Sequence, residues 1–129
     1  MRIGEVAEAA GTTTKTLRFY EVQGLLPPAE RTTAGYRDYT ADAVTRVEFI
    51  HRGQAAGLTL AQIRQILHIR DDGQAPCEHV RMLLDARLAD LDEQISQVSE
   101  LRDTITRLRD QAAHAEPDTC TPDRICRYL

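Results

Sequence analysis

The fold is decided by residues 11–39, which read GTTTKTLRFYEVQGLLPPAERTTAGYRDY. Just before this stretch, apolar residues recur at helical spacing in residues 3–10, and Gly11 ends the helix that they predict. A second helix is predicted from about Thr14 to Gly24, with a Pro-Pro dipeptide just beyond it to prevent continuation. Two short helices joined by a tight Gly-Thr turn are typical of a helix-turn-helix.

The segment that follows predicts a small hairpin and two more helices. Residues 30–39 place turn residues before an alternation of aromatic and polar side chains, which indicates a β-hairpin, or wing. Thr40 is the expected cap of a third helix that ends at Gly57. A fourth helix is predicted to start at Thr59, where Thr-Leu-Ala-Gln fits a capping box.

A long helix is predicted over residues 76–113, after the turn-rich residues 71–75. On the order of 38 residues at 1.5 Å each make it nearly 60 Å long. Its apolar residues step by fours and threes: Leu84, Leu88, Leu91, Ile95, Val98, Leu101, Ile105 and Leu108. A helix this long that is otherwise polar needs a partner, and the simplest is its own copy, in either orientation. The tail, residues 114–129, is expected to be mostly irregular.

Charge and composition narrow the function. Residues 1–70 carry 9 Lys/Arg against 7 Asp/Glu, net +2, and residues 71–129 carry 7 against 13, net −6, which sum to the total of −4. The front half is therefore mildly basic. No stretch approaches the roughly 18 apolar residues of a membrane span, and the first residues lack the apolar core of a signal peptide, so a cytoplasmic protein is expected.

The second helix and the hairpin together are suited to DNA. Lys15 and Arg18 lie on successive helical turns, where they can enter a major groove and anchor on phosphates. The hairpin adds two arginines and two aromatics, a suitable arrangement for clamping a phosphate backbone. Two alternatives stay open: the charged residues are ordinary solvated side chains, or Tyr36 and Tyr39 merely cap the small core.

The sequence resembles the MerR family of transcription regulators over essentially its whole length. The motifs that carry the resemblance match the family's winged-helix domain in order: Ile3-Gly4-Glu5-Val6-Ala7, Thr16-Leu17-Arg18-Phe19-Tyr20-Glu21, Gly24-Leu25-Leu26, Gly35-Tyr36-Arg37-Asp38-Tyr39 and Ala56-Gly57-Leu58-Thr59-Leu60. The resemblance implies a mainly α fold with four parts: a winged helix-turn-helix DNA-binding domain (1–70), a hinge (71–75), a dimerisation helix in an antiparallel coiled coil (76–113), and a metal-binding loop with the C-terminal tail (114–129).

The resemblance also implies a mechanism and its residues. A homodimer binds double-stranded promoter DNA whose promoter elements are spaced too far apart, and effector binding makes it bend and underwind the DNA so that RNA polymerase engages both. The implied DNA contacts are Thr14, Lys15, Arg18, Tyr20 (bracing a phosphate), Arg31, Tyr36, Arg37 and Tyr39. Leu17 and Phe19 are expected in the core.

All three cysteines lie in the back half of the chain. Cys77 would lie in the first turn of the long helix, where the helix dipole favours a thiolate, and Cys120 and Cys126 lie on a Pro-containing loop with five residues between them. Thiolates select soft or borderline ions such as Hg(II), Cd(II), Pb(II) and Zn(II). From spacing alone, the cysteines could equally be unrelated, a small buried residue in the case of Cys77, or a redox pair.

By resemblance, the loop of one chain meets Cys77 of the other, and a cysteine at that position is typical of relatives that sense divalent ions. The sequence departs from many relatives, which have their first loop cysteine directly after the long helix, where this chain has Ala112-Ala113-His114. The departure leaves His79 and His114 as additional candidate ligands. It also leaves the choice of ion open.

Three other functions compete with that of a divalent-metal regulator. The main alternative is a regulator of the same family that senses oxidants or electrophiles through its thiols. A thiol enzyme or metal carrier is disfavoured, because the sequence has no Cys-x-x-Cys, phosphate loop or nucleophile elbow. A drug-sensing regulator is disfavoured because the tail is too short to enclose an organic molecule.

Overall fold

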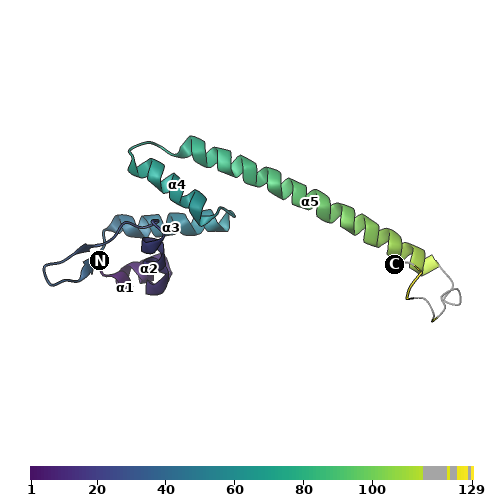
Figure 1. Ribbon diagram of the computed structural model, residues 1–129, viewed down its shortest axis with the longest axis horizontal. Helices are drawn as coiled ribbons and strands as arrows, with labels where there is room; N and C mark the ends of the chain where they lie inside the picture. Colours follow the sequence, from purple (N-terminus) through teal and green to yellow (C-terminus); the bar gives the residue numbers. More distant parts are fainter. Residues whose placement is uncertain (115–121, 123–124, 128) are drawn as a thin grey trace. The chain divides into compact units, whose positions relative to one another are not determined.

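The computed structural model describes residues 1–114, 122, 125–127 and 129. The chain divides into two compact units, Met1–Arg87 and Leu88–Leu129. Within the described residues, the elements follow in this order along the sequence (Figure 1): α1 Ile3–Ala10, α2 Thr14–Val22, β1 Glu30–Arg31, β2 Arg37–Asp38, α3 Ala41–Ala55, α4 Leu60–Asp71 and α5 Cys77–His114. This mainly helical architecture confirms the predicted fold class.

The turn between α1 and α2 forms as the sequence predicts. Gly11 adopts the left-handed conformation at φ 67°, which glycine reaches without steric cost. The Thr13 hydroxyl then caps α2 by accepting a hydrogen bond from the Thr16 N–H at 3.1 Å. The two helices therefore form a tight helix-turn-helix.

The hairpin is short and is tied to the start of the chain. Arg31 lies opposite Arg37 in the antiparallel pair β1–β2, and the Thr32 N–H donates to the Tyr36 carbonyl at 2.7 Å. Directly after β2, the Tyr39 N–H donates to the carbonyl of Met1 at 2.7 Å. The wing is thereby fixed to the segment that precedes α1.

The two following helices differ in how they are capped. Thr40 occupies the N-cap position of α3, as predicted, but its hydroxyl makes no capping hydrogen bond. At α4 the predicted capping box is confirmed, because the Thr59 hydroxyl accepts from the Gln62 N–H at 3.1 Å and the Gln62 side chain accepts from the Thr59 N–H at 3.0 Å.

The core of the first unit lies between α1, α2, α3 and α4. Its fully buried large side chains are Val6, Leu17, Leu25, Leu26, Val47, Ile50, Ile63 and Ile66. Each contributes about 1.5–3 kcal/mol by leaving water. One charged residue joins them: Arg46 of α3 is 3% exposed, donates to the Leu25 carbonyl at 3.0 Å and pairs with Asp71 at 2.7 Å. Its guanidinium group therefore links α3 to the loop after α2 and to the end of α4.

The first turns of α5 pack on this core. The helix begins and ends one residue later than predicted, with Pro76 directly before it. Val80 and Leu83 contact the core, and the Arg87 side chain lies so close to Gly57 that a Cβ there would be 2.4 Å from Arg87 Nε. Glycine is favoured at position 57 by its φ of 84°, and any larger residue there would also displace the end of the Arg87 side chain.

The rest of α5 exposes an apolar stripe. No residue of the helix is buried, and the exposed large apolar side chains on it are Met82, Leu84, Leu88, Leu91, Ile95, Val98, Leu101 and Ile105. Seven of these eight were predicted as the seam, and Met82 was not. Among the described residues, no helix is both long enough and apolar enough to span a membrane.

Candidate nucleic-acid interface and thiol residues

The exposed face of α2 carries two cations, Lys15 and Arg18. Lys15 and Arg18 are exposed, and within the described residues neither forms an ion pair. Thr14, the first residue of the helix, is partly buried beside them. Since these three residues lie in the first half of the helix, an approaching phosphate backbone would meet both the cations and the positive end of the helix dipole.

Phe19 was predicted to lie in the core, and this prediction is wrong. Its side chain is 47% exposed, whereas Leu17 is fully buried and Tyr20 is 4% exposed. The reason is the helical repeat: Leu17 and Tyr20, three residues apart, share the inward face, and Phe19 is turned away from it. Phe19 instead shares the outward face with Lys15, four residues earlier.

Tyr20 was predicted to brace a phosphate, but its location favours packing. Its hydroxyl lies inside the domain, 3.4 Å from the Gln54 side-chain oxygen, and its ring contacts His51 edge-on. Burial raises the pKa of Tyr20. A side chain that is 4% exposed offers little surface to DNA, so we assign Tyr20 to the core.

In the wing, the two tyrosines have different environments. Tyr36 is 55% exposed, whereas Tyr39 is 5% exposed and its hydroxyl donates a short hydrogen bond to the Glu21 carboxylate. Burial, followed by the hydrogen bond with Glu21, raises the pKa of Tyr39. Burial therefore supports the alternative that Tyr39 caps the core, whereas Tyr36 is exposed. The DNA contact predicted for Tyr39 stays a prediction, one that its low exposure disfavours.

Glu21 connects α2 to the wing. Besides accepting from Tyr39, it pairs with Arg37 of β2 at 2.9 Å, and the pKa of Arg37 is raised by its hydrogen bond with Tyr39 and by the Glu21 charge. Arg37 is thus partly neutralised within the domain. Glu21 was not predicted as a site residue. An acidic residue on a helix that also carries Lys15 and Arg18 could have indicated that it pairs with a basic residue of the same domain.

Arg2 is a second residue that the sequence did not single out. Its guanidinium group stacks on the exposed ring of Tyr36, 4.4 Å from the ring centre. Arg31, which was predicted, is exposed and donates to the Gly35 carbonyl at 2.9 Å. Because Arg2 precedes the first helix by one position and lies far along the chain from the wing, only the tertiary structure reveals this contact.

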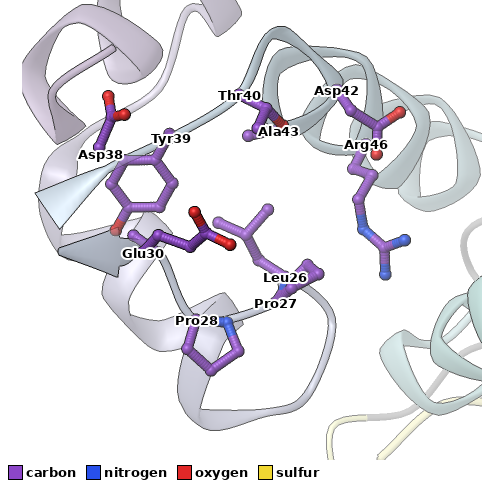
Figure 2. Close-up of a pocket in the computed structure, with 11 residues that line it drawn as sticks. Leu26, Pro27, Pro28, Glu30, Asp38, Tyr39, Thr40, Asp42, Ala43 and Arg46 are labelled. Carbon is purple, nitrogen blue, oxygen red and sulfur yellow. The ribbon is translucent and has the colours of Figure 1, made fainter. Parts of the chain in front are cut away.

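Hollows on the first unit differ in charge. One, of about 250 Å³, is lined by Arg2, Ile3, Arg31, Gly35, Tyr36 and Arg37. Another, of about 200 Å³, lies between the Pro27-Pro28 turn and the start of α3 and carries the acids Glu30, Asp38 and Asp42 (Figure 2). In the second hollow, Asp38 pairs with the Met1 ammonium group and Asp42 with Arg70, and Arg46 also lines it. The first hollow, with three arginines and no acid among the described residues that line it, is therefore the one that attracts phosphate.

The thiol residues are spread over both units. Cys77 is exposed in the first turn of α5, two residues before His79, whose Nε2 atom is buried and has no hydrogen-bond partner among the described residues. His114 is the last residue of α5, and Cys126 is exposed in the tail. Cys120 lies outside the described residues. Within the part of the chain that the structure describes, no three His, Cys, Asp or Glu side chains gather as metal ligands.

These donors fit a thiophilic ion by their chemistry. An accessible thiol and an unpartnered imidazole nitrogen are both ligands that Zn(II) and softer divalent ions accept. The arrangement of the exposed cations on α2 and the wing fits a DNA backbone. Comparisons with known sequences and structures identify the family of proteins to which a chain with these residues belongs.

Residues 1–68 match the family model described as MerR HTH family regulatory protein, and residues 44–108 match one described as MerR, DNA binding. The transcriptional regulator HmrR of Rhizobium leguminosarum is 37% identical over 108 residues, covering 84% of this chain and 83% of that protein. The mercuric resistance operon regulatory protein of Bacillus cereus is 34% identical, with 85% and 83% covered.

Among solved structures, the transcription regulator PbrR691 of Ralstonia metallidurans in complex with lead(II) superposes with a TM-score of 0.74 at 34% identity, covering 93% of this chain and 94% of that one. All three of these relatives are named as regulators, which agrees with the prediction that the chain is not an enzyme. With a family model matched over more than half of its length, the chain belongs to the MerR family of helix-turn-helix regulatory proteins.

Proposed function

We propose that this protein is a metal-responsive transcription regulator that acts in the cytoplasm, binds promoter DNA as a homodimer and activates transcription when a thiophilic divalent ion binds its cysteines. The observation that carries the proposal is the combination of exposed basic residues on α2 and the wing with accessible thiols, in a chain whose relatives include a mercuric resistance regulator and a lead(II)-bound regulator.

The DNA-binding surface combines α2 with the wing. Lys15 and Arg18 are exposed and make no ion pair with other described residues, so their charges are available to phosphates. Arg31 and Tyr36 extend this surface on the wing, and Thr14 supplies a hydroxyl at the start of the helix. Arg37 contributes less, because Glu21 partly neutralises it.

The homodimer contact uses the apolar stripe of α5. Leu88, Ile95 and Val98 are each more than half exposed in the single chain, and the apolar residues from Leu84 to Val98 step by alternating fours and threes, as in a coiled-coil seam. Each would contribute on the order of 1–2 kcal/mol when covered by a partner. We adopt the antiparallel pairing because it brings the C-terminal loop of one protomer to the start of α5 in the other.

The metal site, in this arrangement, is shared between protomers. Cys77 of one chain and Cys120 with Cys126 of the other supply three thiolates, which favour Hg(II), Cd(II), Pb(II) or Zn(II) over hard ions. His79 and His114 are candidates for a fourth ligand, and His79 is favoured because its Nε2 atom is buried without a partner among the described residues. The ion would supply the cross-link between the two chains.

Activation follows from a change in the DNA and needs no direct contact with RNA polymerase. Metal binding across the dimer would favour one relative position of the two DNA-binding units, and thereby a bent and underwound operator that polymerase can use. This requires the ion to bind the two dimer states with different affinity.

The test is a titration of the reduced protein with Hg(II), Cd(II), Pb(II) and Zn(II), followed by thiolate-to-metal absorption and stoichiometry per dimer. We expect tight saturation, lost in Cys77→Ser, Cys120→Ser and Cys126→Ser, while duplex DNA binding is retained. His79→Asn should alter the spectrum or affinity for Zn(II), and His68→Asn, at an exposed position on α4, is its matched control.

Two results would contradict the proposal. If no divalent ion bound tightly but oxidants or electrophiles changed transcription through the same cysteines, the protein would be a thiol-based redox regulator. If all three serine variants lost DNA binding, the cysteines would serve the fold and not the sensing of an ion.

A further inference from the structure

The hollow between the wing and the start of α1 has the properties of an anion site. It measures about 250 Å³ and is lined by three arginines together with Ile3, Gly35 and Tyr36. Arg31 and Arg37 come from the two strands of the wing, and Arg2 comes from the segment before α1. The contact between these two distant segments therefore creates the hollow.

The charges in this hollow are only partly balanced. Arg37 is paired with Glu21, but neither Arg2 nor Arg31 forms an ion pair within the described residues. The nearby Glu5 carboxylate accepts a hydrogen bond from the backbone N–H of Arg2 at 3.0 Å, so it is held by the backbone and not by the guanidinium group. Two guanidinium groups are thus left to face a ligand.

Both groups are held in place before any ligand arrives. Arg2 stacks on Tyr36 at 4.4 Å from the ring centre, and Arg31 donates to the Gly35 carbonyl at 2.9 Å. The hairpin turn is closed by the Tyr36 N–H, which donates to the Thr32 hydroxyl at 3.2 Å. A guanidinium group that is already held in place loses less conformational entropy when an anion binds. Less of the electrostatic attraction is then offset by this entropy cost, so the anion binds more tightly.

The hollow is also linked to the helix of the proposed DNA surface by an ion pair. Arg37, one of its lining residues, is joined at 2.9 Å to Glu21 of α2, the helix that carries Lys15 and Arg18. An anion bound in the hollow would therefore lie at a fixed position relative to the recognition helix. A duplex backbone presents phosphates at regular spacing, so it is a ligand that could contact both the hollow and α2.

We propose that Arg2 and Arg31 jointly bind one backbone phosphate of duplex DNA in this hollow, which makes Arg2 a DNA contact outside the helix-turn-helix. This inference rests on the proposed function, because it requires that the protein bind DNA. Tyr36 acts as a positioning residue that holds the Arg2 guanidinium group flat against the wing.

The experiment compares Arg2→Gln, Arg31→Gln and the double variant in the full chain, with a duplex of mixed sequence as the probe. Affinity is measured over a series of KCl concentrations. Loss of one phosphate contact per protomer, and so of two per dimer, should weaken binding about 10- to 100-fold at low salt and reduce the slope of log K against log[KCl] by about 1.8. Because both arginines hold the same phosphate, the double variant should lose less than the product of the two single losses.

Two further variants separate a direct contact from a general charge effect. Arg81→Gln removes the same charge from an exposed position on α5 and should leave the slope unchanged. Tyr36→Leu keeps all charges but removes the stack, so it should weaken binding less than Arg2→Gln and leave the slope nearly unchanged. Thermal unfolding of each variant checks that the domain is intact, and Arg2→Lys, which keeps the charge, should recover most of the slope.

The outcomes are distinct. If Arg2→Gln behaves like Arg81→Gln, Arg2 is not a DNA contact and the inference is overturned, while DNA binding by the wild type still stands. If inorganic phosphate binds the wild type tightly and Arg2→Gln loses only that binding, the hollow is a site for free phosphate and the inference is again overturned. If the wild type fails to bind any duplex at low salt, it is the proposed function that fails.

Discussion

Shortening Ile95 to alanine should weaken the dimer strongly. The side chain is 66% exposed in the single chain, so a partner helix would remove about two thirds of its surface from water. At about 1.5–3 kcal/mol for a full burial, this is about 1–2 kcal/mol per chain. A twofold dimer contains the residue twice, so the loss is about 2–4 kcal/mol per dimer, or about 25- to 700-fold in the dissociation constant.

The measurement is sedimentation equilibrium over a dilution series, with Ser96→Ala as the control. Ser96 is the next residue along α5 and is also exposed, but it lies outside the apolar stripe. Alanine has a higher helix propensity than isoleucine, and this difference offsets the lost dimerisation free energy by no more than about 0.5 kcal/mol per residue. If Ile95→Ala and Ser96→Ala dimerise equally well, the stripe is not the dimer contact, and the reasoning from exposed apolar surface is refuted.

Three further predictions concern the DNA-binding unit. Tyr39→Phe removes the hydroxyl that donates to Glu21 and should lower the free energy of unfolding by about 1 kcal/mol, measured in urea; an unchanged midpoint would mean that the bond is not stabilising. Arg46→Met should lower the free energy of unfolding by about 1–3 kcal/mol in the same assay, because it leaves the buried Leu25 carbonyl without its donor. A gain in stability would show instead that the apolar side chain packs better. The pKa values of Tyr20 and Tyr39 are raised in the folded chain, so the unfolded chain loses these protons first and stability should fall as the pH rises through about 10. A free energy of unfolding that stays flat between about pH 8 and 11 would contradict this. The variant with both tyrosines changed to Phe should lose the pH dependence.

Much of the local structure was predictable because its causes are local. Gly11 and Gly57 end their helices at positive φ, and Thr13 and Thr59 cap the following helices with their own hydroxyls. Each of these signals involves residues only a few positions apart. The apolar stripe of α5 was predicted for the same reason, since it depends on helical spacing alone.

The candidate DNA surface was predicted only in part. Lys15, Arg18, Arg31 and Tyr36 are exposed as expected. Tyr20 and Tyr39 matched the family pattern equally well, yet the fold buries both. A motif gives the residue type at a position, but it does not distinguish an aromatic that faces DNA from one that supports the residue beside it.

The sequence by itself determined the order of elements, the caps and turns that separate them, the apolar stripe of the long helix and the family. Only the tertiary structure decided that Phe19 faces outward, that Arg46 is buried, that Glu21 joins the recognition helix to the wing, and that Arg2 stacks on Tyr36. The physical reason is that the burial and pairing of a side chain depend on which distant segments pack against it. Arg2 and Tyr36 become neighbours because the Tyr39 backbone binds that of Met1, a contact that no local pattern encodes.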